Sequence, residues 1–398
     1  MSLNAEQKQF LQSVKTGQSV FLSGPAGTGK THTIHALMQE LPYDATGLTA
    51  TTGMAALLIG GRTLHSFLGI GLGDEPVDKL LIAVTRNKPC FNKLKKLKHL
   101  IIDEVSMLSA ELLDKISELL KRIKDNQDPF GGVQMIFAGD FYQLPPVKAE
   151  YAFTSTAWQD LNPAIHILTY NYRQTTDPEL QTILTNIRNN TLTSQDMKRL
   201  KQCKKTTFPE HIIPTKIYSL NKNVDAINQH AYDQLPKDKE HHYTTFQEQQ
   251  VSLCIGAQVM VTRNINHDAG IVNGTRGCVV DLDPEVVLIR TMNGNTVPIP
   301  LLDKKKGKSK KDILKYMPLS LAYAITVHKS QGATIDAAEL DLGANIFEYG
   351  QGYTALSRIR SLKGSRIVSV KSSSFKNHPE VTRFYAAAAA PALAHAFL

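Results

Sequence analysis

The sequence has few cysteines and no long apolar run, and each shortage excludes a class of protein. Its 398 residues contain four cysteines, none of them in the C-x-x-C spacing of a zinc site: Cys90, Cys203, Cys254 and Cys278. Reduced core thiols in a reducing compartment are the simplest interpretation, and a zinc site is not expected.

Targeting signals are also missing from the sequence. No apolar run approaches the roughly 20 residues of a membrane span. The first ten residues, MSLNAEQKQF, are polar and contain neither a signal-peptide core nor an Arg-rich transit peptide. We therefore expect a soluble intracellular protein without a membrane partner.

The composition is that of a globular, basic protein. Hydrophobic residues make up 42% of the chain, so it can bury large cores, and its length suggests about two to three domains. The formal net charge is +9 at pH 7. A positive excess favours an anionic partner, most often nucleic acid.

The most specific motif is the octapeptide GPAGTGKT, which fits the phosphate-loop pattern G-x-x-x-x-G-K-[ST]. An apolar strand precedes it and a helix follows, which is the context that the motif requires. The glycines let backbone N–H groups surround a polyphosphate, and the helix N-terminus adds partial positive charge. Lys30 is expected to reach the β- and γ-phosphates, and Thr31 to hold Mg²⁺. The predicted nucleotide-binding residues are Gly24, Pro25, Ala26, Gly27, Thr28, Gly29, Lys30 and Thr31.

Two acidic residues at the end of a second apolar strand predict the other half of an ATPase site. The segment His99–Glu104 reads HLIIDE. Asp103 is expected to bind Mg²⁺ opposite Thr31, and Glu104 to polarise the attacking water as general base. Surface acids after a strand are the alternative, which the upstream phosphate loop disfavours.

Three further residues are candidates for nucleotide contacts. Gln7 lies just upstream of the loop, and its amide could read the adenine edge, although a solvated helix residue is the alternative. Gln143, in GDFYQLPPV after a strand, could sense the γ-phosphate. Arg173, in TYNYRQ, is a candidate arginine finger, with a structural ion pair as the alternative.

Two segments contain groups that suit contacts with a nucleic-acid strand. The first, GRTLHSFLG, offers Thr63 and His65, while Phe67 would either stack on bases or belong to the core. The second, TVHKSQG, offers Thr326, His328 and Lys329 for a phosphate backbone and Gly332 for nucleotide sensing. The segment YTALSR places another arginine, Arg358, at the end of a helix.

The second half of the chain predicts another α/β unit with a β insert. Short alternating stretches between residues 256 and 300 are separated by Asn-Gly and Asp-Pro turns, which indicates a small β-barrel. The lysine-rich run 304–311 is interpreted as a solvated loop. The alanine-rich tail 386–398 is assigned no function.

Taken together, these motifs resemble superfamily-1B helicases, most closely the PIF (petite integration frequency) family. In family order they are the Gln7 region, GPAGTGKT, TLHSF, IIDEVSM, GDFYQLPPV, NYRQ, NGTRG, AYAITVHKSQG and YTALSR. PFGGVQMI before GDFYQLPPV, and GIGLGDEPVDKLL after TLHSF, single out the PIF branch. The resemblance covers residues 3 to about 370.

This resemblance implies an α/β fold with two RecA-like P-loop domains in tandem. Residues 1–170 would form domain 1A, with a wedge subdomain at about 70–98. Domain 2A would comprise 171–235 and 312–385, and an SH3-like β-barrel, 2B, would occupy 236–311. Larger relatives carry extra regulatory and targeting segments that this sequence lacks.

The resemblance also implies a function, an ATP- and Mg²⁺-dependent helicase moving 5′→3′ on single-stranded DNA and separating duplexes. Lys30, Glu104, Gln143, Arg173 and Arg358 would be catalytic. Thr63, His65, Phe67, Thr326, His328 and Lys329 would grip the strand. G-quadruplex opening, action at duplex junctions and a monomer or weak DNA-dependent dimer are further family expectations. A translocase without strong unwinding, an RNA-preferring helicase and a binding module with a decayed nucleotide site are the alternatives.

Overall fold

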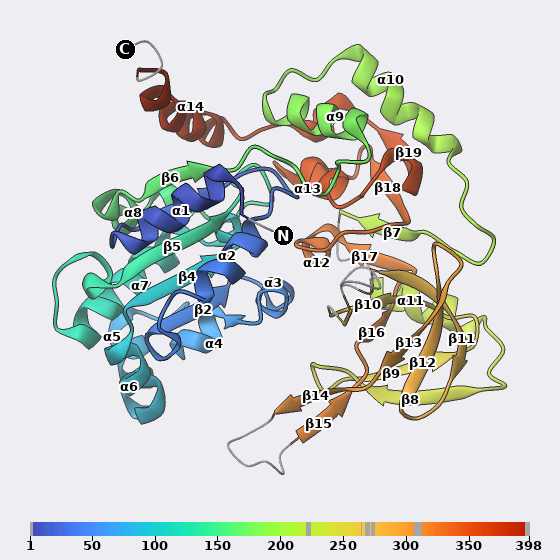
Figure 1. Cartoon of the computed structure of the whole chain (residues 1–398), viewed down its shortest axis with the longest axis horizontal. Helices are drawn as coiled ribbons and strands as arrows, with labels where there is room; N and C mark the ends of the chain where they lie inside the picture. The colour runs from blue at the N-terminus through green and yellow to red at the C-terminus, as the bar shows by residue number, and fades with distance from the viewer. Residues whose placement is uncertain are drawn as a thin grey trace. The chain divides into compact units, whose positions relative to one another are not determined.

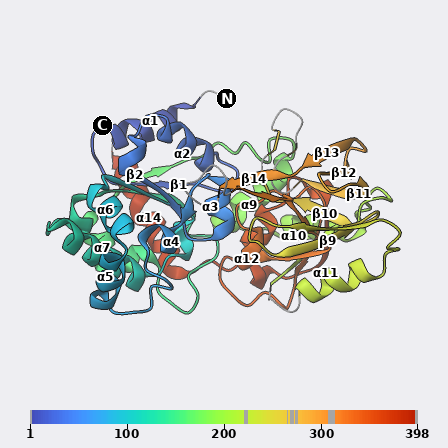
Figure 2. The same ribbon diagram turned by 90° about the horizontal axis from the view of Figure 1, so that it is seen from below.

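The computed structural model describes residues 3–219, 224–263, 265–266, 271, 275–305 and 313–394. The chain divides into two units. Unit 1 holds Met1–Thr175, Glu348–Gly350 and Lys376–Leu398, and unit 2 holds Thr176–Phe347 and Gln351–Phe375. Figures 1 and 2 show the secondary structure of each.

Unit 1 is built on a parallel sheet of six strands in the order β3-β2-β4-β5-β1-β6. Strand β1 lies between β5 and β6, in parallel register with both. The strands are β1 (Val20–Ser23), β2 (Thr46–Ala50), β3 (Arg62–Thr63), β4 (His99–Asp103), β5 (Gln134–Gly139) and β6 (Ala164–Ile167). Because all strands are parallel, their carboxyl ends meet at one edge, where an α/β protein places its ligand site.

Both faces of this sheet are covered by helices, and alternate strand residues point to opposite faces. Val20 and Leu22 face the helices on one side, while Phe21 packs into the larger core on the other. Figure 2 shows α1 and α2 on the first side, and α4 to α7 on the second. The helices are α1 (Ala5–Lys15), α2 (Lys30–Met38), α3 (Gly53–Leu58), α4 (Leu64–Leu68), α5 (Val77–Arg86), α6 (Lys88–Lys96), α7 (Ala110–Lys124) and α8 (Thr156–Leu161).

The excursion predicted at about 70–98 contains helices α5 and α6. Their apolar residues Leu80, Val84 and Leu94 are buried in the same core as α7. Arg122 of α7 pairs with Asp78 at 2.5 Å, and Lys124 donates to the carbonyl of Leu97 at 2.9 Å. Helices α5 and α6 are therefore fixed to α7, and their assignment as a wedge subdomain stays a prediction.

The C-terminal helix α14 (Pro379–Ala394) belongs to unit 1, which corrects the predicted boundary of the second domain at residue 385. Its residues Val381 and Tyr385 are buried in the core beneath β1 and β5. The ring of Phe384 stacks on Phe153 with centroids 4.6 Å apart. The chain thus returns to the first domain after the second domain ends, and this aromatic packing fixes it there.

Unit 2 contains a second parallel sheet, of four strands in the order β17-β7-β18-β19. All three of its neighbouring pairs are parallel. Its strands are β7 (Thr215–Tyr218), β17 (Ala324–Thr326), β18 (Ala338–Leu342) and β19 (Ser365–Val370). Its helices are α9 (Pro178–Arg188), α10 (Ser194–Gln202), α11 (Val224–Asp233), α12 (Val327–Ser330) and α13 (Gln351–Ser357).

The β insert predicted within unit 2 is antiparallel, as expected. Five strands pair in the order β13-β12-β11-β10-β16, and the pairs β8-β9 and β14-β15 stand beside them. The likeness to an SH3 barrel stays a prediction. The strands are β8 (Glu240–Thr244), β9 (Gln250–Cys254), β10 (Gln258–Val261), β11 (Arg276–Leu282), β12 (Val286–Thr291), β13 (Thr296–Pro300), β14 (Leu302–Lys305), β15 (Ile313–Tyr316) and β16 (Leu319–Leu321).

The end of the insert differs from the predicted residue 311. Strand β16 follows that position, yet it pairs with β10 of the insert, whereas β17, only three residues farther on, pairs with β7 of the parallel sheet. Two short apolar strands in succession give the same sequence pattern whichever sheet they join. The lysine-rich run 304–311 begins at the end of β14, and its residues 306–311 lie outside the described part of the chain.

Cys90, Cys203 and Cys254 are buried and Cys278 is half-buried, all four as free thiols. In the part of the chain that the structure describes, no helix is long and apolar enough to cross a membrane.

Candidate nucleotide-binding site

The phosphate loop joins β1 to α2 and packs so closely against its surroundings that a side chain on Gly27 would collide with them. Gly27 has φ +87, and a Cβ there would lie 2.4 Å from the Cβ of Arg173 and 2.8 Å from Oδ1 of Asn171. Only glycine fits this conformation and this space. Helix α2 begins at Lys30, directly after the loop, so the partial positive charge of its N-terminus lies at the loop.

Lys30 places its ammonium group within the loop itself. Its Nζ donates to the carbonyl oxygens of Gly24 at 2.7 Å and Pro25 at 3.0 Å. Thr28 is fully buried and donates its hydroxyl to Pro25 at 2.9 Å. These bonds hold the loop in one conformation and keep the lysine charge where a phosphate group would bind.

The segment after β6 fixes the other side of the loop. The backbone N–H of Tyr172 donates to the carbonyl of Gly27 at 2.8 Å, and Nδ2 of Asn171 donates to the carbonyl of Ala26 at 3.1 Å. Oδ1 of Asn171 accepts the backbone N–H groups of Arg173 and Gln174 at 2.9 and 3.1 Å. The structure therefore brings Arg173 to the phosphate loop, from a position more than 140 residues away in the chain.

Gln7 is buried, so the interpretation as a solvated helix residue is wrong. It forms a capping box with Asn4, in which Oε1 of Gln7 accepts the Asn4 N–H at 3.0 Å. Its Nε2 is buried without a hydrogen-bond partner among the described residues, and lies 2.9 Å from the position of a Cβ on Gly29. A buried amide with an unused donor is costly, and an adenine ring nitrogen could accept from it.

The two acids predicted for catalysis end strand β4. Asp103 and Glu104 are both buried, at 6% and 8% exposure. Glu104 has φ 54, a left-handed conformation, and its N–H donates to Oδ1 of Asp103 at 2.9 Å. Burial and the neighbouring charge of Glu104 raise the pKa of Asp103 to about 7, although the Glu104 N–H bond and the charge of Lys30 oppose that rise.

This pair is a donor set that fits a divalent cation. Two adjacent buried carboxylates repel each other, and burial penalises their charged forms. A magnesium ion prefers carboxylate and hydroxyl oxygens and would compensate that charge. Asp103 together with the hydroxyl of Thr31 could hold it, with Lys30 close enough to lower the pKa of Asp103.

Gln143 follows β5 in a turn that is buried and closely packed. Its N–H donates to the carbonyl of Asp140 at 2.9 Å, and its side chain contacts the Asp140 carboxylate at 3.5 Å. Gly350, with φ +69, packs onto the backbone of this turn, and a Cβ there would lie 2.3 Å from the carbonyl oxygen of Gln143. The segment that leads into α13 therefore fixes the Gln143 turn.

Comparisons with known proteins agree with this geometry. The family profile described as PIF1-like helicase matches residues 2–198, and that of the DNA helicase Pif1 2B domain matches residues 242–282. The ATP-dependent DNA helicase Pif1 of Bdellovibrio bacteriovorus is 31% identical, covering 97% of this chain and 92% of its own. This chain belongs to the PIF1-like helicase family.

Other members of the family resemble the chain over nearly its full length. PIF1 of Danio rerio is 35% identical over 96% of this chain, although the chain spans only 63% of that relative. The crystal structure of Pif1 from Candida albicans superposes with a TM-score of 0.79 at 31% identity, covering 97% and 99% of the two chains. That of Bacteroides Pif1 in complex with ADP-AlF3 and single-stranded DNA has a TM-score of 0.70 at 28% identity, covering 98% of each chain. These neighbours confirm the predicted fold class.

The remaining candidates for nucleotide contacts in this PIF1-like chain belong to unit 2. Arg358 follows α13 and is 2% exposed, and its guanidinium donates to the carbonyl of Thr354 at 3.1 Å and to Oγ of Ser357 at 2.8 Å. Gly332 lies just after α12 with φ +82. Arg358 and Gly332 are thus placed within unit 2, whereas Gln7, the phosphate loop, the β4 acids, Gln143 and Arg173 belong to unit 1.

The residues predicted to contact DNA have different degrees of exposure. Thr63 caps α4 by accepting the N–H of Ser66, and His65 is half-buried on that helix. Phe67, in contrast, is 7% exposed in the core, where Lys93 lies 3.6 Å above its ring and the carbonyl of Phe67 accepts from the same ammonium. Its assignment as a base-stacking residue is corrected, because the ring packs against Gly47 and the core instead.

The residues predicted to contact DNA in the segment TVHKSQG also differ in exposure. Thr326 ends β17 and is 2% exposed, so the predicted contact through its side chain is not supported. His328 is half-buried on α12. The backbone of Lys329 is part of that helix, but its side chain lies outside the described residues.

Two residues near the site were not predicted from sequence. One is Asn171, described above. The other is Tyr385 of α14, whose hydroxyl lies 2.6 Å from Oγ of Ser23 and accepts the N–H of Phe141 at 3.1 Å. Ser23 directly precedes the phosphate loop and Phe141 directly precedes the Tyr142–Gln143 turn. The sequence signal for this contact is the aromatic pair Phe384-Tyr385 before the alanine run, because aromatic residues favour packing into a core over a solvated tail.

Proposed function

We propose that this chain is an ATP-dependent DNA helicase that moves 5′→3′ on single-stranded DNA and separates duplex DNA. One observation carries the proposal. In a PIF1-like chain, unit 1 packs the Asn171–Gln174 segment against the phosphate loop, and the charge of Lys30 in that loop acts on Asp103 of the acid pair. This supports a working nucleotide site over a decayed one.

In this proposal the residues of unit 1 bind and orient ATP. The loop residues 24–31 and Lys30 hold the phosphates, and Nε2 of Gln7 donates to the adenine edge. Thr31 and Asp103 hold Mg²⁺, which supplies charge compensation to the phosphates. Glu104 orients the attacking water and accepts its proton, because it is the second acid of the pair, directly after the proposed magnesium ligand Asp103.

The remaining assignments concern charge stabilisation and sensing. Arg173, held beside Gly27, and Arg358 of unit 2 stabilise the charge that develops during phosphoryl transfer, while Gln143 and Gly332 respond to the γ-phosphate. Thr63, His65, His328 and Lys329 contact the DNA strand. Alternation between ATP-bound and ATP-free states is proposed to convert these contacts into steps along the strand.

The biological setting is proposed from the same family. The protein would act inside the cell at single-stranded DNA and duplex junctions, during replication, repair or recombination. It would work as a monomer or a weak DNA-dependent dimer. Opening of G-quadruplexes is a further activity that the proposal includes.

Strand displacement on tailed substrates tests the proposal. Purified protein, ATP and Mg²⁺ are mixed with a labelled duplex carrying a 5′ tail or a 3′ tail, in DNA and in RNA. We expect unwinding of the 5′-tailed DNA only. Unwinding restricted to the 3′-tailed substrate would refute the polarity. ATPase activity stimulated by DNA but without strand displacement would replace the helicase with a translocase.

The matched control for this assay is Lys30→Ala. This change removes the ammonium that the loop holds, without altering the glycines that set its backbone. We expect the variant to lose hydrolysis and unwinding while it keeps much of its affinity for single-stranded DNA. DNA-stimulated ATPase activity that survived the change would refute the assignment of the loop.

A further inference from the structure

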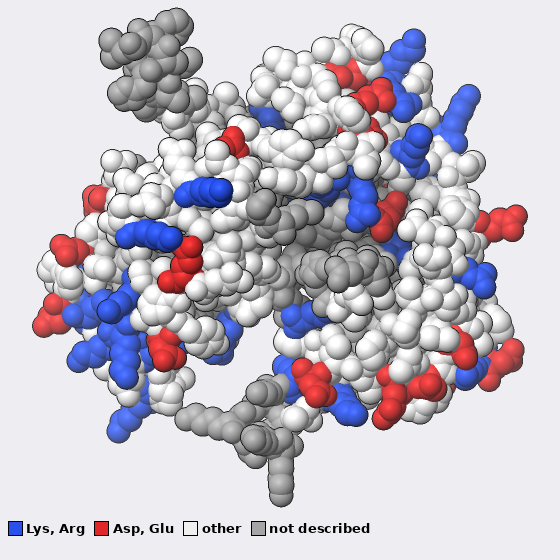
Figure 3. Space-filling model, viewed as in Figure 1, with Lys and Arg blue, Asp and Glu red and all other residues white. Residues whose placement is uncertain are grey.

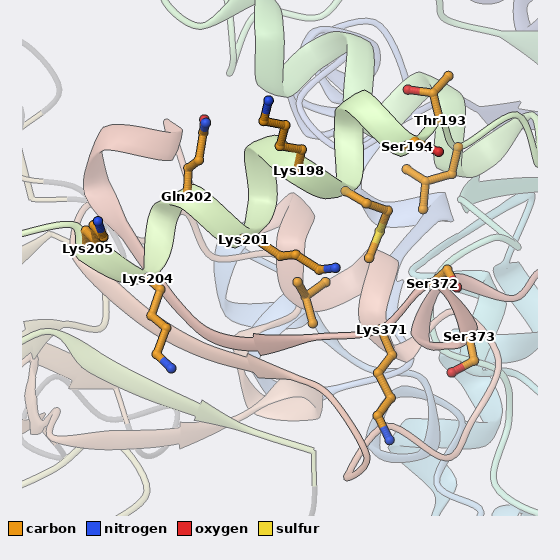
Figure 4. A pocket seen from close by; sticks show the side chains of 13 residues that line it. Thr193, Ser194, Lys198, Lys201, Gln202, Lys204, Lys205, Lys371, Ser372 and Ser373 are labelled. Carbon is orange, nitrogen blue, oxygen red and sulfur yellow. The ribbon is translucent and has the colours of Figure 1, made fainter.

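Unit 2 contains a lysine-lined groove that none of the proposed motor residues lines. It has a volume of about 1030 Å³, and its walls come from α10 with the turn after it, and from the chain that follows β19. Figure 4 shows Lys198, Lys201 and Lys204 following one another along the first wall, with Lys371, Ser372 and Ser373 on the second. Its lysines are Lys198, Lys201, Lys204, Lys205 and Lys371.

Among the residues that the structure describes, the ammonium groups of these five lysines have no partner. All five are exposed, and within the described residues none of their ammonium groups forms an ion pair or a hydrogen bond. Lysines elsewhere do have partners, for example Lys239, whose ammonium lies 2.6 Å from Asp281. No carboxylate lines the groove, since the residues of its walls are lysines, hydroxyl residues, a glutamine and three apolar residues.

Two acidic side chains of α9 and α10 are used within the fold. Asp196 caps α10 by accepting the N–H and the hydroxyl of Thr193 at 2.9 and 2.8 Å. Glu179 pairs with Arg199 at 2.6 Å. Figure 3 shows basic side chains projecting above the surface where Figure 1 places α10.

The spacing of the lysines suits a polyanion with a regular repeat. Lys198 and Lys201 belong to α10 and Lys204 to the 3₁₀ turn after it, so at about 1.5–2 Å per residue the chain rises by roughly 10 Å from the first lysine to the third. One strand of duplex DNA carries a phosphate about every 3.4 Å along its axis, so the row spans about three phosphates. The hydroxyls of Ser372 and Ser373 on the opposite wall are donors of the kind that contact phosphate oxygens.

We propose that this groove binds the sugar-phosphate backbone of a DNA strand, as a site separate from the strand contacts of the motor. The inference rests on the DNA-binding part of the proposed function. Its ligand chemistry is a run of phosphodiesters, which either the duplex ahead of the motor or the displaced strand could supply. Because such contacts read charge and not bases, the site binds without sequence preference and weakens steeply with salt.

The double variant Lys201→Gln/Lys371→Gln tests this site by removing one charge from each wall. Both residues are exposed and unpaired, and glutamine is a good helix former, so folding should be unaffected. The matched control is Lys216→Gln/Lys363→Gln, which removes two exposed lysines of unit 2 outside the groove. Affinity is measured against salt concentration for a short blunt duplex, a fork with a displaced arm, and a single-stranded oligothymidylate.

We expect the groove variant to bind the fork, and also the blunt duplex if the duplex is the ligand, roughly tenfold more weakly at low salt, with a log–log salt slope smaller by about 2. Loss on the blunt duplex would identify the duplex as the ligand, and loss confined to the fork would identify the displaced strand. The control variant should keep the wild-type slope on both. ATPase stimulation by oligothymidylate should be unchanged in either variant.

Two results would overturn the inference. One is equal affinity and equal salt slope for the groove variant and the wild type on every DNA substrate. The other is unchanged DNA binding together with lost binding to polyglutamate, which would make the groove a site for an acidic protein. In both cases intact oligothymidylate-stimulated ATPase activity would leave the proposed helicase function standing, so the two failures are distinguishable.

Discussion

The hydroxyl of Tyr385 connects the C-terminal helix to both strands that lead into the nucleotide site, and its removal is a sharp test of that arrangement. The hydroxyl lies 2.6 Å from Oγ of Ser23, at the end of β1, and accepts the N–H of Phe141, just after β5. Ser23 and Phe141 are 0% and 1% exposed, so water cannot replace the lost partner. The change Tyr385→Phe removes one oxygen and keeps the ring stacked on Tyr142.

The expected magnitude follows from the two groups left behind. A buried polar group without a partner costs about 1–3 kcal/mol, so the two groups left by the loss of the hydroxyl should destabilise unit 1 by roughly 2–6 kcal/mol. For a unit of this size, about 2 kcal/mol already lowers the melting temperature of its transition by roughly 4–8 °C. Because the strand ends carry the loop and the Gln143 turn, kcat for DNA-stimulated ATP hydrolysis should fall by roughly tenfold.

The assay combines thermal unfolding of unit 1 with steady-state ATPase kinetics. The control is Tyr349→Phe, which removes a partly exposed hydroxyl of the same unit and should change stability by less than about 0.5 kcal/mol. Combining Tyr385→Phe with Ser23→Ala should give a loss smaller than the sum of the single losses, since both changes break the same bond. An unchanged melting temperature and kcat in Tyr385→Phe would refute the reasoning.

The other predictions concern the unit 1 site. Glu104→Gln should keep ATP binding but slow turnover by at least about 100-fold, and turnover at the wild-type rate would remove Glu104 as general base. Gly27→Ala should weaken ATP binding by more than about tenfold in a nucleotide titration, because a Cβ would lie 2.4 Å from that of Arg173; wild-type affinity would mean that the Asn171–Gln174 segment moves freely. The pKa of Asp103 is about 7 in the folded state and 3.8 in the unfolded state, so between these pH values the folded state keeps a proton that the unfolded state has lost. The stability of the wild type therefore falls as the pH rises from about 4 to 7. Asp103→Asn should therefore be more stable than the wild type without Mg²⁺ at pH 8, by at most on the order of 4 kcal/mol, with the difference vanishing near pH 4; a stability difference that does not change with pH would contradict the raised pKa.

Several elements of the first domain were predictable because they have strong local signals. The strand before the phosphate loop, the helix after it and the strand that ends at Asp103 lie where the sequence patterns indicate. The phosphate loop itself is a local conformation set by its glycines. Short-range patterns of this kind depend on backbone preferences that neighbouring residues share.

The predictions that failed depend on contacts between distant residues. Phe67 has the same sequence context whether it stacks on a base or packs against Gly47, and only the burial of its ring decides. Strand β16 joins the insert and β17 the parallel sheet, though both are short apolar stretches. The alanine-rich C-terminal helix joins unit 1 through Tyr385, a contact spanning 362 residues of sequence.

The sequence by itself determined the chemistry of this protein. Its ordered motifs indicated the nucleotide loop, the acid pair and the helicase family, because each motif encodes a conformation or a reactive group locally. The tertiary structure decided which groups support them. It placed Asn171 and Arg173 beside the loop, buried Gln7 against Gly29 and anchored two strand ends to Tyr385. These arrangements arise from packing between segments far apart in the chain. Local sequence patterns do not identify the distant segment against which a side chain packs.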